Sequence, residues 1–373
     1  MSKIDELLKN EKVEWKKLGE VCEFQRGNTI TKKDIIKGNI PVIAGGQKPA
    51  YYHGVSNRDG VTIAVAGSGA YAGFVSYWEE PIFLSDAFSI EPNKNLNKRY
   101  LYHWLLSIQH KIFELKQGSS IPHVYGKDLG RFEIPIPPLE AQEKIVKILD
   151  KFTNYITELQ AELQARNKQY EYYRDMLLSE EYLQKLSENP EILGGGGYRL
   201  NSTTLGDIAK IKNGKDWKTL GKGIIPVYGS GGKMNVYVDE HSYNKPTVLI
   251  PRKGSIENIF YVDEPFWNVD TIYYTEIDET KIKPKYFYYF MKTIDLKALS
   301  TNSTRPSLTQ SILSKIKINI PTLEIQNKVV EVLDKFQSLL SDTQGLLPEE
   351  IEQRQKQYEY YREKLLTFDE NML

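Results

Sequence analysis

The second half of this 373-residue sequence repeats the first half at an offset of 184 residues. The segment from Ile134 to Phe152 is matched by the segment from Ile318 to Phe336, and each contains Leu-Glu-x-Gln followed by Leu-Asp-Lys-Phe. The string Lys-Gln-Tyr-Glu-Tyr-Tyr-Arg occurs at 168–174 and again at 356–362. A duplication of this size predicts two copies of one fold and a function that is exercised at two places.

The two copies share scaffold positions and differ in the stretches between them. Leu18-Gly19-Glu20-Val21 corresponds to Leu205-Gly206-Asp207-Ile208, whereas the glycine-rich stretch 44–49 faces the different sequence 229–234. Short Val, Ile and aromatic runs separated by Gly, Asn and Pro predict strands at 40–44, 61–66, 73–78 and 82–90, then a helix at 97–116. In the second copy the same reasoning predicts strands at 248–251, 259–262 and 271–275, then a helix at 284–299. We therefore expect mixed α/β (α+β) lobes at 15–135 and 199–321 that present different loops on one architecture.

A long helix is predicted after each lobe, at 136–180 and 322–367. Apolar residues alternate in steps of three and four, which is typical of a coiled-coil seam. The Tyr-rich strings are offset by 188 residues, so the second helix carries four extra residues, and Gly345 with Pro348 should interrupt or kink it. The Tyr residues could stack on bases, but their spacing favours packing between the helices. The predicted seam consists of Ile145, Leu149, Phe152, Ile156, Leu159, Leu163, Tyr170, Tyr173, Leu177, Val329, Leu333, Phe336, Leu340, Tyr358, Tyr361 and Leu365.

Two shorter segments complete the expected order. Residues 1–14 should form a short helix before the first lobe, and 181–198 a short helix that leads into a flexible link ending in four glycines at 194–197. Two antiparallel helices of roughly 40 residues would hold the lobes about 50 to 60 Å apart.

Charge is distributed unevenly although the whole chain is neutral. Residues 15–133 hold 15 Lys and Arg against 11 Asp and Glu, and residues 199–321 hold 18 against 12, so the remaining segments are acidic. Basic lobes suit a polyanion and acidic helices suit a protein partner, although ordinary surface charge could also produce this pattern. The single Cys22 excludes an intrachain disulfide, and with no signal peptide or long apolar run we expect a cytoplasmic protein without a membrane span. The five His and one Cys show no metal-ligand spacing, so no metal is expected.

Taken together, the motifs resemble the specificity subunits of type I restriction-modification systems. The resemblance rests on Trp15-Lys16-Lys17-Leu18-Gly19-Glu20-Val21, on the Ile-Pro-Ile-Pro-Pro-Leu-Glu-x-Gln start at Ile134, and on the doubled Leu-Asp-Lys-Phe and Lys-Gln-Tyr-Glu-Tyr-Tyr-Arg strings. It implies two target-recognition domains that read the halves of a split, asymmetric sequence in double-stranded DNA, with the helices as a ruler. It also implies docking of two adenine-N6 methyltransferase subunits and of restriction subunits. S-adenosylmethionine, ATP and Mg²⁺ would then belong to those partners, with no cofactor bound by this chain.

Candidate DNA contacts lie in the loops that differ between the lobes. The glycine-rich loops could rest a phosphate on backbone N–H groups, or could simply be tight turns between strands. The loops around 118–123 and 302–307 stand in matching places before the last strand of each lobe, where small hydroxyls and an Arg suit phosphate or base contacts. The candidates are Arg26, Gln47, Lys48, Arg58, Ser68, Ser119, Ser120, His123, Lys215, Lys218, Lys233, Arg252, Lys253, Ser303, Thr304 and Arg305.

Catalytic motifs are missing from the sequence. There is no Gly-rich cofactor loop after a strand, no nucleobase motif of a methyltransferase and no Gly-x4-Gly-Lys-Ser/Thr loop. Asp270 with Glu279-Thr280-Lys281 faintly resembles a metal-dependent nuclease pattern, and a coiled-coil scaffold that binds only protein is a second alternative. We therefore expect a recognition subunit and no catalytic residues.

Overall fold

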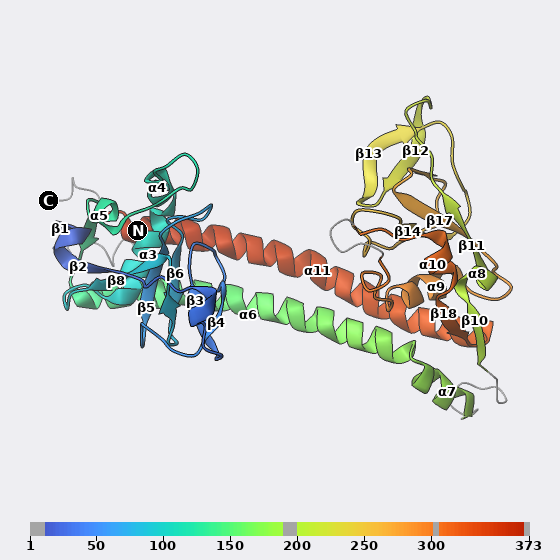
Figure 1. Cartoon of the computed structure of the whole chain (residues 1–373), viewed down its shortest axis with the longest axis horizontal. Helices are drawn as coiled ribbons and strands as arrows, with labels where there is room; N and C mark the ends of the chain where they lie inside the picture. Colours follow the sequence, from blue (N-terminus) through green and yellow to red (C-terminus); the bar gives the residue numbers. More distant parts are fainter. Residues whose placement is uncertain (1–11, 189–199, 301–305, 369–373) are drawn as a thin grey trace, which may run out of the picture. The chain divides into compact units, whose positions relative to one another are not determined.

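The computed structural model describes residues 12–188, 200–300 and 306–368, and the chain divides into two compact units (Figure 1). Unit 1 comprises Met1–Ala161 and Leu347–Leu373, and unit 2 comprises Glu162–Leu346. Each unit holds one lobe, the beginning of the long helix that follows it and the end of the other long helix. Most of the expected helix at 1–14 and the glycine run at 194–197 lie outside the described residues, and Glu14 already belongs to a strand.

Unit 1 contains a four-stranded antiparallel sheet in the order β2-β8-β5-β6 and a three-stranded sheet in the order β4-β3-β7. A further antiparallel pair, β1 with β9, joins the start of the lobe to its end, with Trp15 opposite Pro135. The strands are β1 (Glu14–Lys17), β2 (Cys22–Arg26), β3 (Ile40–Ile43), β4 (Tyr51–His53), β5 (Thr62–Ala66), β6 (Val75–Trp78), β7 (Phe83–Leu84), β8 (Ala87–Pro92) and β9 (Glu133–Ile136). The helices of the lobe are α2 (Leu18–Val21), the 3-10 turn η1 (Lys32–Asp34), α3 (Lys98–Ser107), α4 (Gln109–Glu114) and α5 (Gly126–Leu129).

Unit 2 repeats this topology strand for strand. Its sheets run β11-β17-β14-β15 and β13-β12-β16, and the pair β10 with β18 again joins the two ends of the lobe. The strands are β10 (Asn201–Thr204), β11 (Ala209–Asn213), β12 (Lys222–Gly229), β13 (Gly232–Val238), β14 (Thr247–Pro251), β15 (Phe260–Val262), β16 (Trp267–Asn268), β17 (Ile272–Ile277) and β18 (Lys317–Ile320). The helices are α8 (Leu205–Ile208), α9 (Pro284–Met291) and α10 (Gln310–Ser314), with α7 (Glu180–Glu188) preceding the lobe. The structure thus confirms the mixed α/β (α+β) class and the internal repeat.

Three predicted elements differ from the structure for local reasons. The single strand expected at 82–90 is two strands, because β7 pairs with β3 whereas β8 pairs with β2 and β5. The helix expected at 97–116 is divided at Ile108, whose φ of −102° and ψ of 15° are not helical. The helix expected at 284–299 ends at Met291, after which Asp295 Oδ1 accepts a hydrogen bond from Ala298 N and holds a turn.

The two long helices are α6 (Leu139–Leu177) and α11 (Leu323–Leu366). In unit 1 their contacts run antiparallel, because Phe152 of α6 stacks on Tyr361 of α11 while Tyr155, later in α6, reaches back to Glu350. The expected interruption near Gly345 and Pro348 is wrong, since α11 continues through both residues. Proline removes one backbone donor, and a helix tolerates that loss when packing holds it on both sides. The helix packs into unit 2 before this point and into unit 1 after it.

A buried glutamine fastens each lobe to its own long helix. Gln142 accepts a hydrogen bond from Asn97 N at 2.7 Å and donates to the carbonyl oxygen of Pro137 at 2.8 Å. Gln326 makes the same contacts with Lys283 N at 2.7 Å and Pro321 O at 2.9 Å. Both side chains are fully buried, so each needs all its partners. This explains why Leu-Glu-x-Gln recurs in the two copies.

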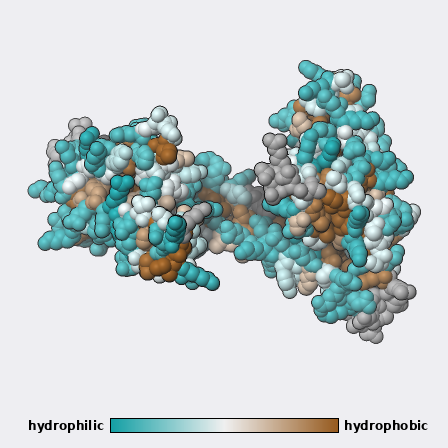
Figure 2. Space-filling view, viewed as in Figure 1, coloured by the Kyte–Doolittle hydropathy of each residue, from teal (hydrophilic) through white to brown (hydrophobic). Residues whose placement is uncertain are grey.

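The hydrophobic core of each unit continues from lobe to helices. In unit 1 one cluster joins Tyr100 and Leu101 of α3 to Leu149 of α6 and Leu365 of α11. In unit 2 the corresponding cluster joins the α9 residue Phe287 to Leu177 and Leu333. Hydrophilic residues cover much of the visible surface of both lobes, as Figure 2 shows. Among the described residues, no helix has both the length and the apolar character that a membrane span requires.

Candidate nucleic-acid interface

Three connections of lobe 1 meet and form what we call the lobe 1 loop cluster, residues 44–49, 67–71 and 117–123. Gly69 N donates to the Pro122 carbonyl at 2.9 Å, and Val124 N donates to the Gly67 carbonyl at 3.0 Å. The first connection packs equally closely, because a Cβ atom at Gly45 would collide with the carbonyl oxygen of Ser68. Loops that are far apart in the sequence therefore present one continuous surface.

Lobe 2 builds an equivalent lobe 2 loop cluster from residues 229–233, 252–258 and 306–308. Leu308 N donates to the Arg252 carbonyl at 2.8 Å, which reproduces the Val124–Gly67 bond of lobe 1. The isolated bridge between Lys253 and Ser307 likewise reproduces the bridge between Ser68 and His123. The backbone frame is thus retained while its side chains differ. The candidates Ser303, Thr304 and Arg305 lie just before the last of these segments, outside the described residues.

Six candidates lie exposed on these loops or beside them. Gln47, Lys48, Ser119 and Ser120 are exposed in the lobe 1 loop cluster, and Gly118, with φ +99°, makes the turn that carries the serines. Arg252 is exposed in the lobe 2 loop cluster, and Arg26 is exposed at the end of β2. These side chains remain available to a ligand. Lys215 and Lys218 are also exposed, but they lie in a separate connection between β11 and β12.

Arg58 and Ser68 are corrections to the sequence prediction, because both are committed to contacts within lobe 1. The Arg58 guanidinium donates to Ser89 Oγ at 2.8 Å and to the carbonyl oxygens of Asn57 and Gln25 at 2.7 and 3.1 Å. Partial burial also lowers its pKa. Ser68 is 8% exposed and donates its hydroxyl to Asp86 Oδ2. Arg58 pins a loop to the sheet, and Ser68 orients a carboxylate.

Two basic candidates of lobe 2 are held by carboxylates. Lys253 Nζ lies 2.8 Å from Asp270 Oδ2, and Lys233 Nζ lies 3.3 Å from Glu264 Oε1. Both lysine side chains are about half exposed, at 51% and 44%, so their ammonium groups still reach solvent. Their positive charge is largely balanced locally, which reduces their value as phosphate contacts.

A cavity of about 190 Å³ lies beside the lobe 1 loop cluster. His123, another candidate, lines it, and its ring is stacked on Tyr125 with the centroids 6.0 Å apart. Lys127 lies over the other aromatic ring, with Nζ 5.5 Å from the Tyr125 centroid. Asp86 and Lys127 also line this cavity and were missed from the sequence. The repeat held a signal for Asp86, because Asp270 occupies the position 184 residues later.

A carboxylate holds each lobe against both long helices. In unit 1, Asp150 Oδ1 accepts from Arg99 Nε at 2.8 Å and lies 2.8 Å from His103 Nε2, whose other ring nitrogen lies 3.0 Å from the Tyr358 hydroxyl. Burial opposes the charge of Asp150, but the hydrogen bonds from His103 and Arg99 outweigh it and lower its pKa. Burial lowers the pKa of His103 more than Asp150 raises it. This junction fixes the orientation of the loop cluster's lobe relative to the helices of its own unit.

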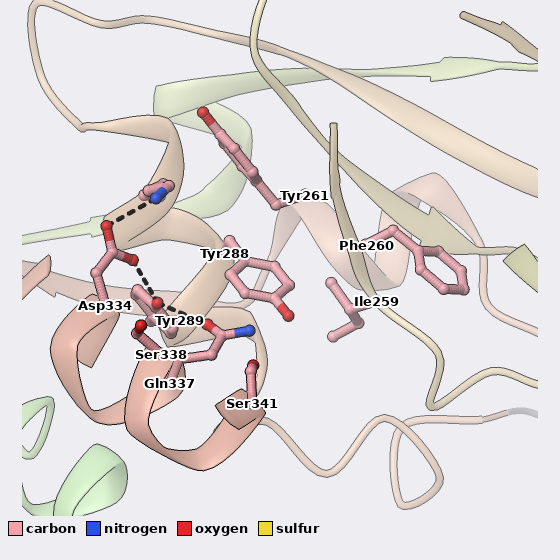
Figure 3. Close-up of a pocket in the computed structure, with 10 residues that line it drawn as sticks. Ile259, Phe260, Tyr261, Tyr288, Tyr289, Asp334, Gln337, Ser338 and Ser341 are labelled. Carbon is pink, nitrogen blue, oxygen red and sulfur yellow. Dashed lines mark hydrogen bonds and ion pairs between the residues drawn. The ribbon is translucent and has the colours of Figure 1, made fainter. Parts of the chain in front are cut away.

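In unit 2 the same position is occupied by different chemistry (Figure 3). The Tyr289 hydroxyl lies 2.6 Å from Asp334 Oδ1 and 2.8 Å from Gln337 Oε1, between α9 and α11. Lys285 Nζ lies 2.7 Å from Asp334 Oδ2, as Arg99 does from Asp150 in unit 1. A cavity of about 590 Å³ adjoins this junction, lined by Tyr261 and Tyr288 as well.

The seam candidates take the same places in the two units. Ring stacks repeat: Phe152 lies 5.3 Å from Tyr361, and Phe336 lies 5.3 Å from Tyr173. The middle tyrosine of each Tyr-rich string is exposed, Tyr172 at 65% and Tyr360 at 59%. Buried seam residues are Ile145, Leu149, Ile156, Leu159, Leu177, Val329, Leu333, Tyr358 and Leu365, and half-buried ones are Phe152, Leu163, Tyr170, Tyr173, Phe336, Leu340 and Tyr361.

The nuclease-like residues are committed to separate local contacts. Asp270 pairs with Lys253, while Lys281 donates to Asp278 and to the Asp207 carbonyl at 3.0 Å. Within the described ranges, no group of three or more His, Cys, Asp or Glu side chains is placed to hold a metal ion. The geometry therefore favours recognition over cleavage.

Comparison with known proteins agrees with this arrangement. The family model described as "Type I restriction modification DNA specificity domain" matches residues 10–168 and again 200–353. A Haemophilus influenzae protein named as a type I restriction enzyme specificity subunit is 32% identical over 404 residues, covering 98% of this chain and 98% of its own. The Escherichia coli EcoR124I/EcoR124II specificity subunit is 28% identical, covering 99% of this chain and 97% of its own.

Solved structures show the same fold. The S subunit of a type I restriction-modification system from M. genitalium superimposes with a TM-score of 0.60 at 22% identity, covering 97% of this chain and 98% of its own. The family model matches both lobes with much of the helices, and the H. influenzae relative aligns over nearly the whole length. On this evidence the chain belongs to the family of type I restriction-modification DNA specificity subunits.

Proposed function

We propose that this chain reads a bipartite, asymmetric target in double-stranded DNA, one half-site with each loop cluster. The observation that carries the proposal is the repeated backbone frame, in which the bond from Val124 to Gly67 recurs as Leu308 to Arg252. Identical frames hold different side chains, so the two lobes would select different bases. The chain supplies DNA specificity and is not the catalytic subunit.

Charge and exposure support DNA on the lobes and protein on the helices. Exposed Lys48, Arg26 and Arg252 lie in or beside the loop clusters, where phosphates attract them. On the helices, the exposed tyrosines Tyr172 and Tyr360 occur once in each unit at equivalent positions. Exposed aromatic residues are typical of protein interfaces. Two equivalent surfaces would dock two copies of one partner, the adenine-N6 methyltransferase subunit, and restriction subunits would complete the complex.

The helices would set the length of the unread spacer. Helices of roughly 40 residues correspond to about 60 Å, or roughly 15 to 18 base pairs of B-DNA. S-adenosylmethionine would be bound by the methyltransferase, and ATP with Mg²⁺ by the restriction subunits. Such a complex acts on DNA in the cytoplasm.

Exchange of one lobe tests the proposal. Residues 199–321 are replaced by the corresponding lobe of a relative, the chain is coexpressed with its methyltransferase, and modified adenines are mapped across the host genome. One half-site should change, while the other half-site and the spacer stay the same. A change in both halves would refute separate reading, and DNA binding without sequence preference by the assembled complex would favour a protein-only scaffold.

A control addresses the ruler. Four residues inserted after Leu159 add about 6 Å of helix while nearly keeping its phase, so the spacer should lengthen by one or two base pairs. An unchanged spacer with normal modification would assign the distance to the methyltransferase subunits.

A further inference from the structure

One aspartate occupies the same place in the frame of both loop clusters. Asp86 lies between β7 and β8, and Asp270 lies between β16 and β17. Both are exposed, although each stands directly before a buried strand. An exposed carboxylate repels phosphate, so its presence twice on a surface proposed to bind DNA calls for a positive role.

The partner of this aspartate differs between the lobes. Asp86 Oδ2 accepts a hydrogen bond from the neutral Ser68 hydroxyl, which leaves the negative charge in place. Asp270 Oδ2 is paired with Lys253 Nζ at 2.8 Å, and that lysine stands at the backbone position equivalent to Ser68. The first lobe therefore presents a hydrogen-bond acceptor, and the second presents a half-exposed ammonium donor held by a carboxylate.

The surroundings of Asp86 suit a base edge better than a phosphate. Asp86 lines the cavity of about 190 Å³ together with the aromatic side chains of Phe24, Phe88 and Tyr125. Flat apolar walls favour contact with bases, while Arg26 and Lys127, which also line the cavity, provide cations for the neighbouring backbone. A carboxylate accepts from the exocyclic amino group of a base, whereas a lysine donates to guanine O6 or N7.

We propose that Asp86, oriented by Ser68, reads an exocyclic amino group of cytosine or adenine in the first half-site, and that Lys253, held by Asp270, reads guanine in the second. This inference rests on the proposed function and adds the residues that set base preference. The serine-to-lysine difference beside a shared aspartate would convert one frame from acceptor to donor.

The test uses the full chain assembled with its methyltransferase, a randomised DNA library and Asp86→Asn. Asn adds an amide donor and removes the charge, so one position of the first half-site should lose its preference by about 5- to 150-fold, with the second half-site unchanged. Lys253→Gln should relax one position of the second half-site only. Asp34→Asn is the matched control, because Asp34 accepts from the Thr31 hydroxyl at 2.6 Å outside the loop clusters, and both half-sites should remain unchanged.

Analogues then identify the base at the affected position. The wild-type complex should lose binding when cytosine there lacks its 4-amino group, or when adenine is replaced by purine. If Asp86→Asn does not fold, Ser68→Ala keeps the carboxylate and should weaken discrimination at that same position. Unchanged preference in Asp86→Asn, or in Ser68→Ala where it replaces that variant, would overturn this inference and leave the lobe-exchange result standing. A wild-type complex without any sequence preference would instead overturn the proposed function.

Discussion

The repeated junction between lobe and helices predicts that one substitution has unequal costs in the two units. Asp150→Ala removes the shared acceptor of His103 and Arg99 in unit 1, and Asp334→Ala removes the acceptor of Tyr289 and Lys285 in unit 2. The two aspartates are 184 residues apart and similarly exposed, at 29% and 35% of their side chains. Their neighbours decide the difference.

In unit 1 the loss falls on a buried group. His103 is fully buried, and without Asp150 its Nε2–H donor has no recorded partner among the described residues. An unpaired buried donor costs about 1 to 3 kcal/mol. Arg99 keeps its position 4.4 Å from the Tyr77 ring centroid and adds about 0 to 1 kcal/mol as a partly exposed ion pair. We expect Asp150→Ala to lower the free energy of unfolding of unit 1 by about 1 to 4 kcal/mol.

In unit 2 a second acceptor is already present. The Tyr289 hydroxyl keeps Gln337 Oε1 at 2.8 Å when Asp334 is removed, and the 41% exposed Lys285 can be hydrated instead. The expected loss from Asp334→Ala is about 0.5 to 1.5 kcal/mol, mostly from one hydrogen bond.

Hydrogen exchange read by mass spectrometry measures both losses in the intact chain, because peptides from each lobe report the opening of their own unit. Asp150→Ala should accelerate exchange in lobe 1 more strongly than Asp334→Ala does in lobe 2. Asp34→Asn, at the exposed turn η1, serves as a control with little effect on either core. Equal losses, or a larger loss for Asp334→Ala, would refute the reasoning from the remaining acceptor.

Three further predictions concern the cores and the junction. Lowering the pH from 7 to 5 should destabilise unit 1, because burial lowers the pKa of His103 and the unfolded imidazole takes up its proton first, with a limit of about 1.4 kcal/mol per pH unit; His103→Gln should flatten this dependence in urea titrations. Leu149→Ala and Leu333→Ala should each cost about 2 to 5 kcal/mol in their own unit, since both side chains are fully buried, and a loss under 1 kcal/mol would contradict their place in the core. Burial raises the pKa of the Cys22 thiol to about 12, so a thiol reagent at pH 8 should label it only when unit 1 opens, and rapid labelling of the native chain would argue otherwise.

The sequence by itself determined the repeat, the lobes and the long helices, because these depend on local chemistry and period. Identical strings fixed the duplication, and heptad spacing placed Leu149 and Leu333 on buried helix faces. Boundaries were less certain where two sheets compete for one run of residues, as at β7 and β8. Pro348 misled for a related reason, since the packing that keeps α11 helical involves residues far away in sequence.

Only the tertiary structure decided which polar side chains face a ligand. Arg58 and Ser68 looked like Gln47 and Lys48 in the sequence, yet Arg58 reaches Ser89, 31 residues away, and Ser68 reaches Asp86. Asp86 became a candidate only when the fold placed it beside His123 in one cavity. Hydrogen bonds and ion pairs are short-ranged in space and unrestricted in sequence separation, so composition and spacing cannot show which charges neutralise one another. The fold sets those distances.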